Sequence, residues 1–164
     1  MGFAAKRTDV TRELFIPANE GYIEAGTRIN RSSYAVVQGA ADTDTPIIWF
    51  TVKVPDDFVS FTKVEAVWAS PAVTGNMWWG MGADYAAVGE DSSMHSDNPE
   101  AGETATGGAD IMNVQRPKNP LTLADLAAGD YLGLVFTRYG SNAADTLDTV
   151  VDLLGILFTY TAEQ

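Results

Sequence analysis

The sequence predicts an all-β protein that folds as one jelly-roll-like β-sandwich of about eight strands. Apolar and polar side chains alternate along residues 47–54, as in a half-buried strand. Two apolar runs of strand length, residues 131–139 and 151–161, flank an acidic stretch that is rich in turn residues. Short runs of this kind, separated by turn signals, are typical of sandwiches and barrels, and the long irregular connections favour a jelly roll over a meander.

Proline, glycine and other turn-forming residues mark where the expected strands begin and end. Pro55 ends residues 47–54 because proline has no amide hydrogen to donate, and Gly129 precedes the turn into residues 131–139. Residues 89–109 predict a long exposed loop with room for one short strand. Residues 121–127 have space for one helical turn. The expected strands are residues 14–16, 33–38, 47–54, 63–69, 77–87, 110–115, 131–139 and 151–161.

The alternation within these strands also predicts which side chains fill the core. Along residues 77–87, Met77, Trp79 and Met81 share a face, and Trp78 and Gly80 share the opposite face. The same reasoning applied to the other strands gives the expected core, which is Phe50, Val52, Trp68, Trp79, Phe136, Ile156 and Phe158.

The chain divides into an expected N-terminal arm, residues 1–12, and a sandwich domain, residues 13–164. The arm carries Lys6 and Arg7 and has little apolar periodicity, so it predicts either a frayed terminus or a segment that docks on a neighbouring subunit. No apolar segment follows the basic pair, so we expect no secretory signal and synthesis in a cytoplasm. No run approaches the roughly 20 apolar residues of a membrane span.

Composition excludes several classes of function. Of the 164 residues, 46% are hydrophobic, which is enough for a packed core, and the formal net charge is −12. An acidic surface repels phosphate backbones and anionic bilayers, so we expect neither a nucleic-acid partner nor a membrane partner. The chain has no cysteine, which excludes disulfides, cysteine nucleophiles and thiolate metal sites.

The sequence predicts a protein that is not an enzyme, with no catalytic, cofactor or metal site. The single histidine, His95, lies in the expected loop, where nothing fixes it for a Ser-His-Asp triad. Calcium is the open alternative, because the spacing of Asp145, Asp148 and Asp152 would align on one helix face. No calcium-loop spacing is present, and solvated turn residues are the favoured interpretation.

Two tryptophans are candidates for a binding role. Trp49 and Trp78 lie on faces opposite the expected core, and Gly80 and Gly82 beside Trp78 predict close backbone approach. Three interpretations of Trp78 stay open. It could cap a second packed surface of the fold, lie in a subunit interface, or serve as a platform on which a sugar stacks.

The last two expected strands lack a polar face. In residues 131–139, Gly133 and Val135 lie on the face opposite the core-facing side chains. In residues 151–161, Gly155 and Leu157 lie on the corresponding face. Because both faces are apolar, we expect a loop, the arm or another subunit to cover them. An uncovered apolar sheet favours self-association. The candidate interface residues are Lys6, Arg7, Trp49, Trp78, Tyr131, Val135, Leu153 and Leu157.

The segments GDYLGLVFTR and LLGILFTYTA, joined by an Asp-rich loop, together with FTVKVPDDFVSFTKVEAVWASPAVTGNMWWGMGADYAA, resemble small β-sandwich virion proteins of tailed bacteriophages. The resemblance implies a capsid decoration (cement) protein, made in the host cytoplasm, that stabilises the head from the outer capsid surface. It also implies two partners, the major capsid protein and further copies of itself, as a homotrimer. The alternative is a receptor- or carbohydrate-binding module of a head or tail fibre.

One observation separates the two functions. A carbohydrate binder leaves Trp49 or Trp78 exposed in a groove edged by polar side chains, because sugars need both an apolar platform and hydrogen-bond partners. A decoration protein instead presents apolar outer faces that neighbours cover.

Overall fold

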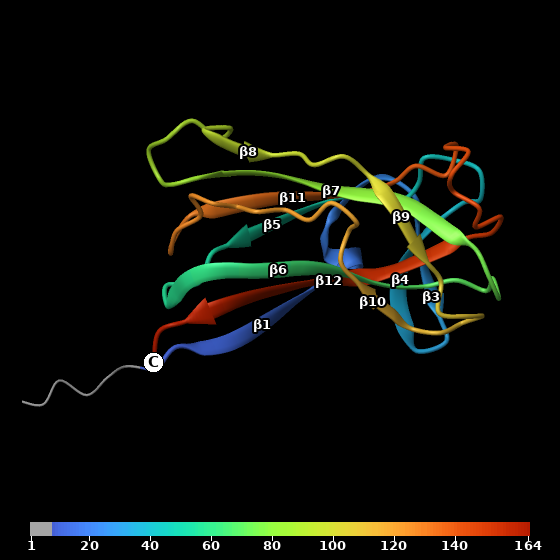
Figure 1. Ribbon diagram of the computed structural model, residues 1–164, viewed down its shortest axis with the longest axis horizontal. Helices are drawn as coiled ribbons and strands as arrows, with labels where there is room; N and C mark the ends of the chain where they lie inside the picture. Colours follow the sequence, from blue (N-terminus) through green and yellow to red (C-terminus); the bar gives the residue numbers. More distant parts are fainter. Residues whose placement is uncertain (1–7) are drawn as a thin grey trace, which may run out of the picture.

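The computed structural model describes residues 8–164, which form two antiparallel sheets packed face to face (Figure 1). The first sheet contains β1 (Val10–Pro17), β3 (Thr27–Arg31), β4 (Tyr34–Gly39), β6 (Phe58–Ala69), β10 (Asn113–Gln115) and β12 (Val151–Ala162). The second contains β2 (Tyr22–Ala25), β5 (Ile47–Lys53), β7 (Asn76–Ala86), β8 (His95–Asp97), β9 (Gly102–Ala105) and β11 (Tyr131–Arg138). The predicted all-β sandwich is confirmed.

The pairing order shows how the long strands organise both sheets. In the first sheet the order is β10-β6-β12-β4-β3, and β1 pairs with β12 on the edge that it shares with β4. In the second the order is β2-β5-β11-β7-β8, and β9 also pairs with β7. In residues 8–164 the only helical element is a 3₁₀ turn, η1 (Ala18–Glu20), and none is long and apolar enough to cross a membrane.

Each of the eight expected strands coincides with an observed strand, and four short strands are additional. These four are β2, β3, β8 and β9, which have few buried side chains and therefore little apolar pattern. Residues 121–127 form no helix. They hold a turn in which the amide of Leu126 donates to the carbonyl oxygen of Leu123 at 3.2 Å, and both leucines are buried.

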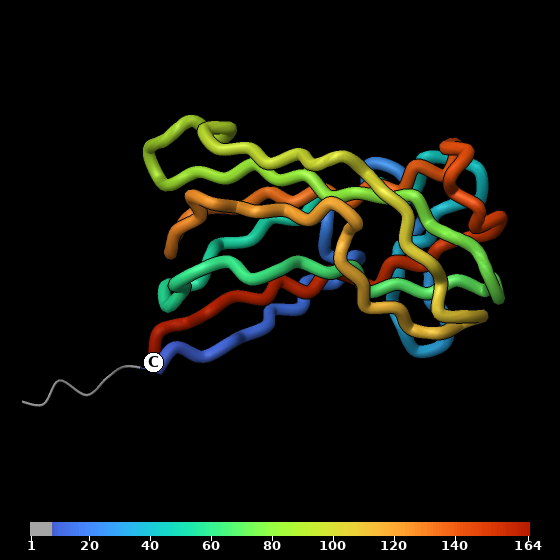
Figure 2. Tube along the Cα trace, in the orientation of Figure 1, coloured from blue at the N-terminus to red at the C-terminus, as the bar shows by residue number. Residues whose placement is uncertain are grey.

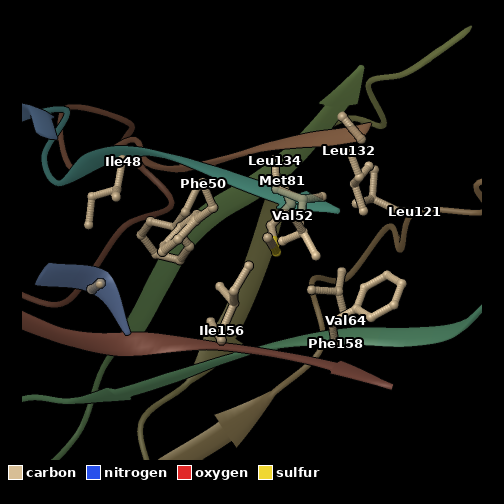
Figure 3. Packing of buried hydrophobic residues seen from close by; sticks show 14 of the residues in the cluster. Ile48, Phe50, Val52, Val64, Met81, Leu121, Leu132, Leu134, Ile156 and Phe158 are labelled. Atoms are coloured by element: carbon tan, nitrogen blue, oxygen red, sulfur yellow. The ribbon is translucent and has the colours of Figure 1, made fainter. Parts of the chain in front are cut away.

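The core lies between the two sheets, as Figure 3 shows for side chains such as Phe50 and Leu134 facing Ile156 and Phe158. All seven predicted core residues are buried, with Trp68, Trp79 and Phe136 fully so. The alternation pattern therefore assigned the inward faces of β5, β7 and β11 correctly. Burial of rings of this size contributes about 1.5–3 kcal/mol each to folding.

The face assignment of Leu153 was wrong. The register between β12 and β6 shifts between Leu153 and Gly155, so one extra residue enters β12 at this point. Such a bulge moves the residues before it to the other face of the sheet. Leu153 is therefore 0% exposed in the core, on the same side as Ile156, and is no interface residue.

The N-terminal boundary also differs from the expectation. β1 begins at Val10, inside the expected arm, because Val10 to Pro17 pair with Ala162 to Gly155 of β12, and the two strands run side by side in Figure 2. A Cβ added at Gly155 would lie 2.7 Å from Cζ of Phe15. The Phe15 side chain of β1 thus covers part of the second face of β12. Lys6 and Arg7 lie outside the described residues.

Candidate functional site

Three neighbouring strands of the second sheet bring outward-facing side chains together. Val135 of β11 pairs with Trp49 of β5 on one side and with Gly82 of β7 on the other. Two residues further along β11, Thr137 pairs with Gly80. The ladder then continues past β11, where the amide of Tyr139 donates to the carbonyl oxygen of Trp78 at 2.8 Å.

A short segment forms one wall beside these strands. β8 and β9 pair with opposite ends of β7, and residues 98–101, which connect them, lie over the intervening glycines. A Cβ at Gly80 would lie 3.1 Å from Cα of Ala101, and one at Gly82 would lie 2.3 Å from Oδ1 of Asn98. Gly80 therefore allows the close backbone approach that was predicted, whereas Gly82 makes room for the side chain of Asn98.

The wall and the sheet enclose a groove of about 420 Å³. Its aromatic lining comes from Trp78 and Tyr139, and its polar lining comes from Asn98, Glu100, Thr137 and Asn142. A smaller hollow of about 80 Å³ lies between Trp49 and Asp84 and shares Gly82, Asn98 and Val135 with the first. The two hollows thus form one continuous surface, called the outer groove below, from Tyr139 to Trp49.

The four tryptophans separate into two pairs, as their faces predicted. Trp49 is 43% exposed, and its indole N–H donates to Oε2 of Glu24 at 2.7 Å. Trp78 is half-buried in the groove wall. Trp68 and Trp79 are instead in the core, and their indole N–H groups donate to Gln115 at 3.2 Å and Thr104 at 2.6 Å.

A buried ion pair holds the loop that supplies Tyr139 and Asn142. Arg138 is 0% exposed, and its guanidinium donates two hydrogen bonds to Asp145, at 2.9 and 2.8 Å. It also donates to the carbonyl oxygens of Ala40, Thr149 and Leu147. Asp145 in turn accepts the amide of Trp78 at 3.0 Å. This cluster fixes the 139–150 loop against the sandwich next to the groove.

Two of the three aspartates that could have formed a calcium site, Asp145 and Asp152, make other contacts in the fold. No helix aligns them, because Asp145 lies in a loop and Asp152 in β12. Asp152 accepts Nε2 of Gln38 at 2.8 Å and lies 3.2 Å from Nε of Arg31. Asp110 and Asp152 together raise the pKa of Arg31, and the largest cause is the hydrogen bond that Arg31 donates to Asp110. Residues 8–164 contain no cluster of three or more His, Asp or Glu side chains that could hold a metal.

His95 lies in a strand rather than in a loop, contrary to expectation. It pairs with Tyr85 of β7, and the two rings stack with centroids 5.1 Å apart. Its Nδ1 lies 3.7 Å from a carboxylate oxygen of Asp125. Neither His95 nor Asp125 lines the outer groove.

The structure brings Trp49, Trp78 and Val135 together and leaves the other candidates apart. Tyr131 lies on the same face of β11 but near its start, whereas Leu157 belongs to the first sheet. Asn98, Glu100, Tyr139 and Asn142 were not predicted as site residues. They lie in connections that the sequence pattern showed only as polar and turn-rich, so no local signal placed them beside Trp78.

Comparison with known proteins shows only distant similarity. No family model matches the chain, and no curated protein matches it. The chain is similar to a solved structure of TmCBM61 in complex with β-1,4-galactotriose, with 11% identity over 94% of this chain and 88% of the other and a TM-score of 0.39. It is also similar to a family 11 carbohydrate-binding module from Clostridium thermocellum in complex with a β-1,3-1,4-mixed-linked tetrasaccharide, with 9% identity, coverage of 95% and 91%, and a TM-score of 0.35.

Proposed function

We propose that the protein binds carbohydrate in the outer groove and does not cleave it. The observation that carries the proposal is the composition of this groove, where Trp78 and Tyr139 lie among Asn98, Glu100 and Asn142. An exposed tryptophan beside polar side chains is the feature that distinguishes a carbohydrate binder from a capsid decoration protein. The outer groove has this feature at its Trp49 end, beside Asp84 and Asn98, and the half-buried Trp78 adds a second indole ring.

The two kinds of side chain match the two surfaces of a sugar. The C–H groups of a pyranose form an apolar face that packs against an aromatic ring, and its hydroxyls form a polar edge. Asn98, Glu100 and Asn142 supply amide and carboxylate groups for that edge. Among residues 8–164, no hydrogen-bond acceptor engages the indole N–H of Trp78, so this donor can serve a hydroxyl.

The length of the groove favours an oligosaccharide over a single sugar. Trp49 and Trp78 belong to strands separated by β11, and Trp78 lies four residues along β7 from Gly82, the residue level with Trp49. Strand geometry puts their Cα atoms about 16 Å apart. Tyr22, which is 71% exposed, pairs with Trp49 and extends the aromatic surface to the next strand.

The groove is built on rigid elements. Trp49, Val135 and Thr137 lie within paired strands, and the Arg138–Asp145 ion pair fixes the loop that carries Asn142. A preformed surface loses little conformational entropy on binding, which favours affinity for a flexible glycan.

The absence of cleavage is part of the proposal. Glycoside hydrolases use a pair of carboxylates about 5–10 Å apart across the scissile bond. Glu100 and Asp84 line different hollows of the outer groove, and the proposal gives neither of them a catalytic role. We expect no release of reducing ends from any glycan that binds. A reducing-end assay at several pH values checks this expectation directly.

The virion role implied by the sequence resemblance stays a prediction, as do the capsid partner, the trimer and the location on a capsid surface. The outer groove fits the alternative interpretation, a receptor- or carbohydrate-binding module, because that function needs a polar-edged aromatic groove. A decoration protein has no need of one.

Calorimetric titration with a panel of neutral oligosaccharides of different linkages tests the proposal. We expect at least one to bind the wild type, and Trp78→Ala and Trp49→Ala each to weaken that binding about tenfold, or about 1.4 kcal/mol. Tyr34→Ala is the control, because Tyr34 is an exposed aromatic residue on the other sheet. No binding by any glycan, or equal loss in the control, would contradict the proposal.

A further inference from the structure

All charged side chains that line the outer groove are carboxylates. Glu100 lines the larger hollow and Asp84 lines the smaller one, and both are exposed. Glu24 adds a third carboxylate beside Trp49, where it accepts the indole N–H. No lysine, arginine or histidine from residues 8–164 is among the lining side chains of either hollow.

The cations of the surrounding surface do not neutralise these carboxylates. Lys53, at the far end of β5, pairs with Asp56 at 2.9 Å, and Lys118 pairs with Glu103 at 3.4 Å. Arg138 is buried beneath the 139–150 loop and pairs with Asp145. Within the described part of the chain, neither Glu100 nor Asp84 forms an ion pair. The groove thus carries a local negative charge on a protein whose net charge is already −12.

We propose that the outer groove selects glycans by charge: it accepts neutral sugars and amino sugars and rejects uronate and sulfated sugars. This inference rests on the proposed carbohydrate-binding function. Binding desolvates the groove, and a uronate brought beside Glu100 or Asp84 would meet a like charge without a compensating cation.

Amino sugars should instead be attracted by the carboxylates of the groove. A protonated amine on the sugar ring is a donor with a positive charge, and Glu100 and Asp84 can accept a charge-assisted hydrogen bond from it. The carboxylates would also attract such a glycan at a distance when the ionic strength is low. We therefore expect affinity to decrease from glucosamine oligomers through neutral oligomers to uronate oligomers of equal length and linkage.

The test compares three oligosaccharides that share a length and a linkage and differ in charge: glucose, glucosamine and glucuronate oligomers. The linkage is the one that the wild type binds best in the neutral panel. Calorimetry at about pH 6 and low salt keeps the amine protonated and limits screening. Relative to the glucose oligomer, we expect the wild type to bind glucosamine about threefold more tightly and glucuronate at least about tenfold more weakly.

Charge-removing variants identify the residues responsible. Glu100→Gln combined with Asp84→Asn should raise the affinity for glucuronate relative to that for glucose about tenfold. Glu13→Gln is the matched control, because Glu13 is an exposed glutamate on β1 of the other sheet, and it should leave the ranking unchanged. Thermal unfolding of each variant verifies that the fold is intact.

The outcomes separate the two proposals. If glucose and glucuronate oligomers bind the wild type equally, or if the double variant leaves their ratio unchanged, selection by charge is wrong and the carbohydrate-binding function stands. If no oligomer of any charge binds, both proposals fail.

Discussion

Trp49 and Trp78 differ from Trp68 and Trp79 in what surrounds their rings. The second pair fills the core and donates its indole N–H groups to Gln115 and Thr104, whereas the first pair lies along the outer groove. Alternation along β5 and β7 separated these pairs from sequence alone, because in a strand neighbouring side chains point to opposite faces. At the scale of single residues, local periodicity is enough to assign the faces of regular strands.

Tyr160 gives the fold a predicted dependence on alkaline pH. Its ring is buried beside Phe58, and its hydroxyl lies 3.3 Å from Oδ1 of Asp57. Burial, followed by the charge of Asp57, raises the pKa of Tyr160 above its usual value. A raised pKa in the folded state means that this residue's contribution to stability is complete below about pH 10 and is lost as the pH rises further.

Urea unfolding at a series of pH values checks this dependence. We expect the free energy of unfolding of the wild type to fall above about pH 10, and that of Tyr160→Phe to fall less steeply over the same range. Tyr22→Phe is the control, because Tyr22 is exposed and should keep the wild-type slope. Equal slopes for the wild type and Tyr160→Phe would contradict the assignment.

At the scale of elements, the sequence predicted every long strand and missed the features that depend on contacts between strands. The bulge near Leu153 is set by the pairing of β12 with β6, and nothing in the run itself marks it. Strands β8 and β9 form because β7 offers edges to pair with, whereas Gly102 is the only one of their own residues that is buried. Asp145 was interpreted as a solvated turn residue because Arg138, its partner, lies in a different element.

The Arg138–Asp145 pair should be essential to the 139–150 loop. Asp145→Ala leaves a guanidinium buried without its carboxylate, which costs about 3–5 kcal/mol. Chemical denaturation measures this loss, and Asp148→Ala, an exposed aspartate of the same loop, should change stability by about 0.5 kcal/mol or less. Similar small effects for both variants would show that the pair does not hold the loop.

At the scale of the whole molecule, the outer groove joins segments that are far apart in the sequence. Trp49, Trp78, Asn98, Val135 and Asn142 come from five separate segments, and only the sheet order β5-β11-β7 places them together. The sequence identified Trp49, Trp78 and Val135 as candidates because each is an apolar residue on a predicted outward face, where polar residues are expected. The sequence could not identify Asn98 or Asn142 as site residues, because polar residues are common in loops and only the fold shows which of them line a groove.

Val135→Glu separates glycan binding from self-association. Val135 is half-buried in the floor of the groove, so a glutamate there should abolish glycan binding by blocking the surface. Because the side chain faces outward, we expect the fold to persist and the sedimentation coefficient to stay at the wild-type value. A decrease in particle size would instead support the subunit interface that the sequence also suggested for this residue.

The central claim, that a glycan binds across the outer groove, is tested most directly by the indole N–H signals of the four tryptophans in a ¹⁵N-correlation NMR spectrum. Each signal is assigned by its Trp→Phe variant, and the protein is titrated with the neutral oligosaccharide that binds best. Because Trp49 and Trp78 line the groove while Trp68 and Trp79 lie in the core, we expect the first two signals to shift in proportion to saturation and the other two to stay in place. Unchanged Trp49 and Trp78 signals in the presence of a saturating glycan would contradict the claim.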